Sequence, residues 1–134
     1  MRFINFMNDN LSNALDLYQS ARDLMSKNLI AEAVVLFQKS AEVDPHFKTL
    51  ELLGECYVRL NRLRESVIPL AAAVSLNKSS RAASLLAEVF LELNDYDKAK
   101  NMAEIALSRE PNNKKALKVS QIVTADGDWQ KRNS

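Results

Sequence analysis

The stretch "LELNDYDKAK", Leu91 to Lys100, ends one helix-like pattern at Asn94 and begins another within two residues. The segments "VRLNRLRESV" at 58–67 and "LMSKNLIAEAV" at 24–34 have the same arrangement. Each has an asparagine at the break, a bulky apolar residue two positions later and a small residue three positions after that. Because Asn28, Asn61 and Asn94 are spaced by 33 residues, the sequence predicts a helical unit repeated three times.

Apolar and small residues recur at fixed distances from each asparagine. The residues four positions before it are Leu24, Tyr57 and Phe90. The residues seven positions before it are the small Ala21, Gly54 and Ala87. Spacings of three and four residues place these side chains on one face of a helix. The small residues predict a close approach of two helices, with the larger side chains filling the space beside them.

This pattern resembles the tetratricopeptide repeat, a helix-turn-helix unit of about 34 residues. The resemblance implies an all-α fold, a right-handed α-solenoid of antiparallel helix pairs with about seven helices. The sequence departs from the family pattern at Leu17, Leu50 and Ala83, where a tryptophan is common. The expected parts are a lead-in at 1–13, a repeat domain at 14–125 and a tail at 126–134. The repeat domain is expected to consist of repeats 14–46, 47–79 and 80–113 and a capping helix 114–125.

The family often has glycine where this chain has Asn28, Asn61 and Asn94. Chain reversal after a helix favours a left-handed residue, and asparagine tolerates that conformation better than other residues with a side chain. We therefore expect all three to be left-handed. Pro69, in the second helix of the middle repeat, is expected to distort that helix without breaking it.

Composition narrows the class of protein. A chain of 134 residues is expected to form one compact domain. The 18 basic and 17 acidic residues nearly cancel, which argues against nucleic acid as the main partner. No run approaches the roughly eighteen apolar residues of a membrane span, and the N-terminal "MRFINFM" is too short for a signal peptide core. A cytoplasmic location is the simpler expectation.

The sequence offers little for catalysis. Cys56 and His46 are the only residues of their types, so neither a disulfide nor a Cys-based zinc site is predicted. There is no glycine-rich phosphate loop and no nucleophile elbow, so we predict no catalytic residue, no metal and no cofactor. Cys56 is expected to be a buried packing residue. Asp97 is better placed to cap the second helix of its repeat than to act as an acid or base.

The last segment begins like another first helix. Leu117 is predicted to take the place of Leu50, with Gln121 and Thr124 at the small and aromatic positions. The end of a solenoid needs a polar outer face, so this helix is interpreted as a cap that ends at Asp126-Gly127. For Trp129 three alternatives stay open: packing back on the last helix, a disordered tail, or a self-association contact.

In a solenoid of this kind the first helix of each pair lines the concave face. The helical period and the repeat spacing arrange the inward positions in rows across the helices. One row is basic, a second has acidic residues in its middle, a third is apolar, and further positions lie between them. The basic row is Leu15, Lys48, Arg81 and Lys115; the second row is Arg22, Glu55, Glu88 and Ile122; the apolar row is Met25, Val58 and Leu91; the other positions are Tyr18, Glu51, Ser84 and Lys118. These stripes could bind an extended or helical peptide in one orientation. The alternative is that they are ordinary solvated helix faces.

Two classes of function follow. The first is a binding module, a scaffold or adaptor that holds a protein or peptide partner. The second is a self-associating structural unit, such as a homodimer. A small bacterial secretion-type chaperone is a further alternative, by resemblance alone.

Some family members clamp the C-terminal carboxylate of chaperone tails with basic and asparagine residues. The corresponding positions here are Tyr18, Arg22, Leu52, Arg81 and Leu85. Because only Arg81 keeps the basic character of its own site, the sequence argues against such a clamp. A different acidic ligand on Lys48, Arg81 and Lys115 stays open.

Overall fold

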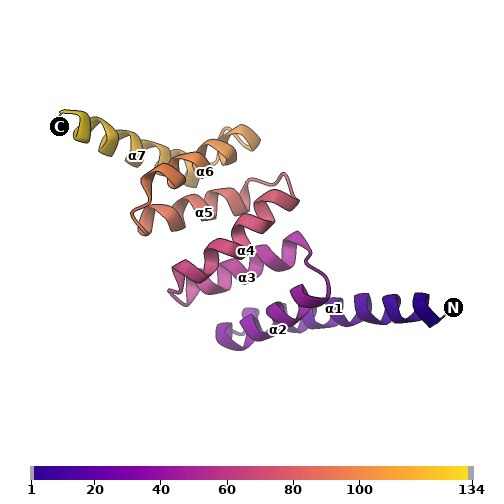
Figure 1. Ribbon diagram of the computed structural model, residues 1–134. Coiled ribbons are helices and arrows are strands. Elements are labelled where there is room, and N and C mark those ends of the chain that lie inside the picture. Colours follow the sequence, from indigo (N-terminus) through magenta and orange to yellow (C-terminus); the bar gives the residue numbers. More distant parts are fainter. Residues whose placement is uncertain (1, 133–134) are drawn as a thin grey trace. The chain divides into compact units, whose positions relative to one another are not determined.

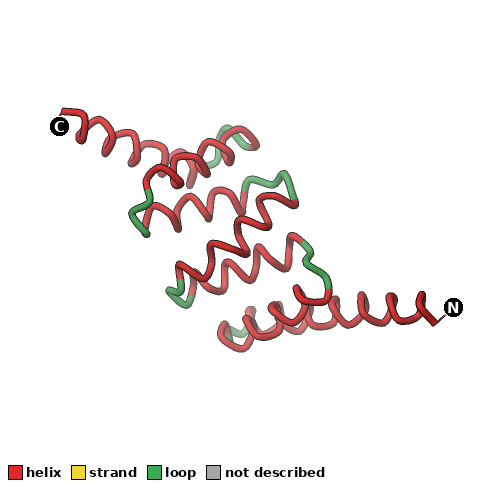
Figure 2. Tube along the Cα trace, in the orientation of Figure 1, coloured by secondary structure: helices red, strands yellow, loops and turns green. Residues whose placement is uncertain are grey.

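The computed structural model describes the backbone of residues 2–132 and the side-chain surroundings of residues 12–125 and 127. Within residues 2–132 the backbone forms seven helices and no strand, joined by short loops (Figures 1 and 2). The helices are α1 (Arg2–Ser26), α2 (Ile30–Val43), α3 (Phe47–Arg59), α4 (Leu63–Leu76), α5 (Arg81–Glu92), α6 (Tyr96–Arg109) and α7 (Lys114–Arg132). The predicted all-α repeat of helix pairs is confirmed.

The chain divides into two compact units, residues 1–76 with α1 to α4 and residues 77–134 with α5 to α7. The sequence predicts a single domain. The boundary falls at "NKSS", residues 77–80, where the middle repeat lacks the proline that ends the other two. Each unit has buried apolar side chains of its own, such as Phe37 and Tyr57 in the first and Leu86 and Val89 in the second.

Left-handed asparagines end the first helix of every repeat. The φ angles of Asn28, Asn61 and Asn94 are 61°, 57° and 61°. The next residue after each asparagine donates its N–H to a carbonyl five positions earlier. These bonds are Leu29 to Leu24 at 2.9 Å, Arg62 to Tyr57 at 2.8 Å and Asp95 to Phe90 at 2.9 Å. This is the Schellman arrangement, and it satisfies carbonyls that the helix end would leave open. The predicted left-handed turns are confirmed.

Gly54 lies where α3 and α4 approach each other closely. A Cβ built on Gly54 would lie 2.5 Å from Cγ and Cδ2 of Leu70, whose side chain is fully buried in α4. Ala21 and Ala87 occupy the equivalent positions in the other repeats and are fully buried too. The predicted role of the small residues is therefore confirmed.

Pro69 lies inside α4 and is buried, and the helix continues through it as expected. The capping prediction for Asp97 is wrong. Asp95 is the N-cap of α6, and its carboxylate accepts a bond of 3.3 Å from the backbone N–H of Lys98. Because α6 begins at Tyr96, Asp97 already lies in the first turn, too late to be the cap.

Both terminal helices extend beyond their predicted bounds. α1 begins at Arg2, so residues 2–13 of the expected lead-in are part of the first helix. α7 continues to Arg132, past Gly127. A glycine weakens a helix by about 1 kcal/mol but keeps its backbone N–H, so it does not have to end one. The side chain of Trp129 lies outside the described residues, so the three alternatives for its role stay open.

The register of α7 differs from the prediction by one residue. Ala116, Val119 and Val123 are its buried positions, whereas Leu117, Gln121 and Thr124 are exposed. The side chain of Asn113 accepts a bond of 3.0 Å from the N–H of Ala116, which caps the helix. This cap starts α7 at Lys114, one repeat length after Arg81, so Ala116 rather than Leu117 takes the core position.

We expect Gly54→Ala to reduce the free energy of unfolding by about 1–3 kcal/mol, because the new methyl group must displace Leu70. The matched control is Gly127→Ala, also in a helix but with open space around its Cβ position. That change should stabilise the protein by about 0.5–1 kcal/mol through helix propensity alone. Urea denaturation measures both; equal effects of the two changes would contradict the close approach.

Asn94→Ala should cost about 1 kcal/mol of stability, because alanine is strained at a φ of 61°. Asn94→Gly should leave the free energy of unfolding nearly unchanged, since glycine adopts this conformation freely. Thermal or urea unfolding of the two variants decides the matter. A glycine variant as unstable as the alanine variant would show that the asparagine side chain, not the backbone conformation, is what matters.

Candidate functional site

A hollow of about 210 Å³ lies beside the middle of α1 and the beginning of α3 in the first unit. Its lining residues come from both helices, from the end of α2 and from the loop before α3. They are Ala14, Leu15, Tyr18, Ser40, Asp44, His46, Lys48 and Thr49. Leu15 is 54% exposed, so an apolar side chain is open to a partner at this site.

Internal contacts hold the walls of this first hollow in place. The Ser40 hydroxyl donates a bond of 2.7 Å to the Ala14 carbonyl and ties α2 to α1. The Tyr18 ring packs edge-on against Phe37, with 6.0 Å between the ring centroids. On the other side, His46 Nδ1 accepts a bond of 3.1 Å from the N–H of Lys48 and caps α3. The hollow is therefore preformed.

A second hollow, of about 410 Å³, lies beside the beginnings of α5 and α7 in the second unit. Its lining residues are Ser80, Arg81, Ser84, Glu110, Asn112, Asn113, Lys114 and Lys115. Seven of these eight lie 66 residues, two repeat lengths, after a lining residue of the first hollow. The hollow is therefore a product of the repeat itself, and the side chains decide what each copy can bind.

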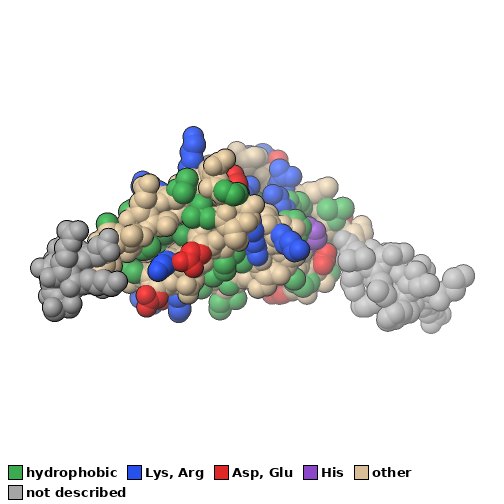
Figure 3. All heavy atoms as spheres, turned by 90° about the horizontal axis from the view of Figure 1, so that it is seen from above, with side chains coloured by type: hydrophobic (Ala, Val, Ile, Leu, Met, Phe, Trp, Pro, Cys, Tyr) green, Lys and Arg blue, Asp and Glu red, His purple; other side chains and the backbone are tan. Residues whose placement is uncertain are grey.

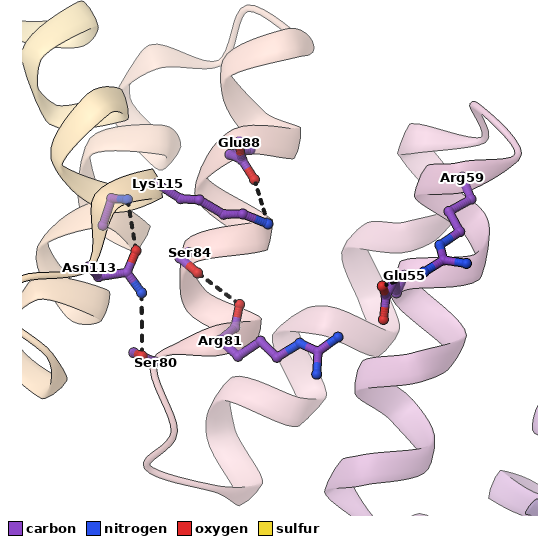
Figure 4. A network of polar contacts seen from close by, with 9 residues as sticks. Glu55, Arg59, Ser80, Arg81, Ser84, Glu88, Asn113 and Lys115 are labelled. Carbon is purple, nitrogen blue, oxygen red and sulfur yellow. Dashed lines mark hydrogen bonds and ion pairs between the residues drawn. The ribbon is translucent and has the colours of Figure 1, made fainter. Parts of the chain in front are cut away.

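Hydrogen bonds organise the floor of the second hollow. The Glu110 carboxylate accepts from the Ser80 hydroxyl and, at 3.2 Å, from the Asn113 side-chain amide. These two bonds, that from Ser80 first, lower the pKa of Glu110. Asn113 also donates to Ser80 at 3.4 Å while its side-chain oxygen caps α7 (Figure 4). One carboxylate of the hollow is thus held by uncharged donors.

An ion pair crosses from α7 to α5 beside this hollow. Lys115 Nζ lies 3.6 Å from Glu88 Oε1, with the lysine side chain reaching across to α5 (Figure 4). The exposed fractions of the two side chains are 61% and 37%. On α5 the Ser84 hydroxyl donates to the Arg81 carbonyl at 3.0 Å, so it is used within its own helix. The accessible charged groups here are the cations and Glu88.

The predicted inward residues separate into three groups. The hollows bring together Leu15, Tyr18 and Lys48 in the first unit, and Arg81, Ser84 and Lys115 in the second. Others lie outside the hollows and stay predictions: Arg22, Met25, Glu55, Val58, Glu88, Leu91, Lys118 and Ile122. Glu51 and Ser84 are only 2% and 3% exposed, although Ser84 lines the second hollow. Their side chains offer almost no surface to a partner, and Glu51 forms an ion pair of 3.9 Å with Lys48.

Sequence reasoning missed the loop residues of both hollows. Asp44 and His46 lie before α3, and Glu110, Asn112 and Asn113 lie before α7. Helical period assigns inward positions only to residues on helices, although a loop that enters a helix also borders the space beside it. The constant spacing of two repeat lengths is the signal that could have found them.

Charge is mixed rather than segregated on the face drawn in Figure 3, where basic, acidic and hydrophobic side chains are interspersed. Among the described residues, no group of three or more His, Cys, Asp or Glu is placed to hold a metal ion. Nor does any described helix have the length and apolar character needed to cross a membrane.

Comparison with known proteins identifies the fold. Residues 80–113 match the tetratricopeptide repeat family model. No curated protein sequence matches the chain significantly.

Solved structures of tetratricopeptide repeat (TPR) domains match the chain closely in three dimensions. The first TPR of Spaghetti (RPAP3), bound to the HSP90 peptide SRMEEVD, has 23% identity and a TM-score of 0.79 over 86% of this chain and 93% of that one. The second TPR domain of human RPAP3, in complex with the HSP70 peptide SGPTIEEVD, has 16% identity and a TM-score of 0.76. The match covers 88% of this chain and 98% of that one. The Arabidopsis OM64 TPR domain has 14% identity and a TM-score of 0.80, and the match covers 87% of this chain and 98% of that one.

The chain is thus an all-α helical-repeat protein with the fold of TPR domains. Residues 80–113 are themselves a tetratricopeptide repeat, as the sequence predicted for this segment.

Cys56 should be inert toward thiol reagents in the folded protein. It is fully buried, and burial, with a smaller contribution from Glu55, raises the pKa of its thiol to about 11. The reactive thiolate is therefore scarce at mildly alkaline pH. We expect slow reaction with a chromogenic disulfide reagent in buffer and fast, stoichiometric reaction in urea. Rapid reaction of the native protein would show that α3 opens locally.

Proposed function

We propose that this protein is a non-enzymatic interaction module that binds a peptide segment of a partner protein along its first helices. Each of the two hollows is a point at which a side chain of such a segment is received. One observation carries the proposal: the same hollow occurs in both units at positions two repeat lengths apart. Because the repeat itself forms the hollow, the support for binding lies in its lining, where the exposed Leu15 borders walls held by internal contacts.

The size of the first hollow favours a peptide side chain over a small molecule. At about 210 Å³ the first hollow is smaller than the roughly 300–1,000 Å³ of a pocket for a drug-sized ligand. It is suited to one apolar side chain, with Leu15 and Tyr18 as its apolar wall. Peptide segments held through alternate side chains in separate pockets are a common mode of recognition.

The peptide-bound RPAP3 domains support a peptide as the partner, but the chemistry of their site is not carried over. At the positions of the chaperone-tail clamp this chain has Leu52, which is 7% exposed, and Leu85, which is half-buried. Neither can hold a carboxylate. The proposal is therefore a peptide module without that clamp, in the cytoplasm, and without a cofactor.

The test is selection of peptides from a phage-displayed library of random sequences on the intact chain, followed by affinity measurement. Leu15→Asp should weaken the selected peptides about tenfold, because it removes the apolar rim of the first hollow. The matched control is Ile68→Asp. Ile68 is 80% exposed on α4 and lines neither hollow, so this change should leave affinity unaltered.

Two outcomes would count against the proposal. Failure to select any binding peptide would remove it, and equal losses in Leu15→Asp and Ile68→Asp would show that the first hollow is not the site. Analytical ultracentrifugation separates the self-associating alternative. A dimer that Leu15→Asp dissociates and Ile68→Asp does not would assign the hollow to a second copy of the chain.

A further inference from the structure

We propose that the second hollow selects an acidic side chain, an Asp or Glu within the bound segment. The carboxylate of that side chain would take the place at Lys115 that Glu88 now occupies. This inference rests on the proposed peptide-binding function and names the chemistry that one of its two hollows reads.

The lining of the second hollow is predominantly cationic. Arg81, Lys114 and Lys115 line it against one carboxylate, that of Glu110. Glu110 accepts hydrogen bonds from the Ser80 hydroxyl and the Asn113 amide and keeps its negative charge, which offsets only one of the three cations. A carboxylate that enters the hollow would therefore meet an excess of positive charge.

The lysines of α7 lie where helix stability disfavours them. α7 has no acidic residue in its first turn, yet Lys114, Lys115 and Lys118 are among its first five residues. The partial positive charge at a helix N-terminus repels cations. The second helices follow the usual preference, with Glu32, Glu65 and Asp97 in their first turns. The first helices α3 and α5 have no acidic residue there either, and α7 differs from them in having three lysines among its first five residues.

The ion pair between Lys115 and Glu88 is weak enough for a ligand carboxylate to replace Glu88. Its separation of 3.6 Å exceeds that of a good charged hydrogen bond, and both side chains retain contact with solvent. Such exposed pairs contribute little to stability. A ligand carboxylate can therefore replace Glu88 at small cost, and Glu88 acts as an internal competitor that occupies the lysine until a ligand arrives.

The charges also favour a peptide over nucleic acid. Glu88 and Glu110 interrupt the cations, and the chain carries a net charge of only +1, so a run of phosphates would meet repulsion. The first hollow has a different preference, because Leu15 and Tyr18 replace Arg81 and Ser84 at the equivalent positions. The first hollow therefore suits an apolar side chain and the second an acidic one.

The experiment uses acetylated and amidated synthetic copies of the selected peptides, each with a partner in which Asp and Glu are replaced by Asn and Gln. Lys115→Gln should weaken the acidic peptide about fivefold. Glu88→Gln should strengthen it about twofold, because the internal competitor is lost. The opposite signs distinguish this mechanism from a loss of structure, which would weaken both.

The controls carry the same charge changes elsewhere in the second unit. Lys100→Gln and Glu104→Gln alter exposed residues of α6 that do not line the second hollow, and neither should shift the affinity of the acidic peptide. Unfolding midpoints measured in parallel confirm that all four variants are folded.

Other results would overturn the inference. Binding peptides without acidic residues, or affinities unaffected by Lys115→Gln and Glu88→Gln, would remove it while leaving the proposed function intact. Tighter binding of a single-stranded oligonucleotide than of any peptide would replace the acidic side chain by phosphate as the ligand. Absence of any peptide binding would remove the proposed function and, with it, this inference.

Discussion

Three left-handed asparagines determine how this chain folds back on itself. Asn28, Asn61 and Asn94 each reverse the chain within about two residues of a helix end, and the Schellman bond that follows fixes the direction in which the next helix leaves. Close packing between the two helices depends on that direction. Gly54 can lie against Leu70 only because the turn at Asn61 brings α4 back along α3.

The same constraint explains the hollows. Because the turns recur at a constant spacing, each unit places a helix start, a preceding loop and the neighbouring first helix around one space. The backbone supplies the location, and the side chains supply the chemistry. At Leu15 the first copy is apolar, whereas its equivalent Arg81 makes the second copy cationic. A repeat protein can in this way present two hollows of different chemistry with one architecture.

Much of this fold follows from the sequence because it depends on residue types with few alternatives. A left-handed position accepts asparagine or glycine, and a close helix contact accepts only a small residue, so Asn94 and Gly54 could be assigned in advance. The register of α7 could not. There Leu117 is the more hydrophobic choice, and the Asn113 cap, which decides the start of the helix, involves a residue common in loops.

The site was less predictable than the fold for a related reason. Helical period finds residues on helices, so Lys48 and Arg81 were found and His46 and Asn112 were not. Burial was a second source of error. Glu51 and Ser84 share the inward phase of their helices, yet neighbouring side chains cover them, and no periodicity reveals how closely those neighbours pack.

The pattern of helix contacts has a consequence for how the molecule is made. Within each unit, helices touch partners one or two elements away in the chain, as α1 touches α2 and α5 touches α7. Such a low contact order keeps the entropy of loop closure small, so the barrier to folding is low. Each helix pair can therefore form early in folding, and the neighbouring helices of its unit then cover its remaining apolar face.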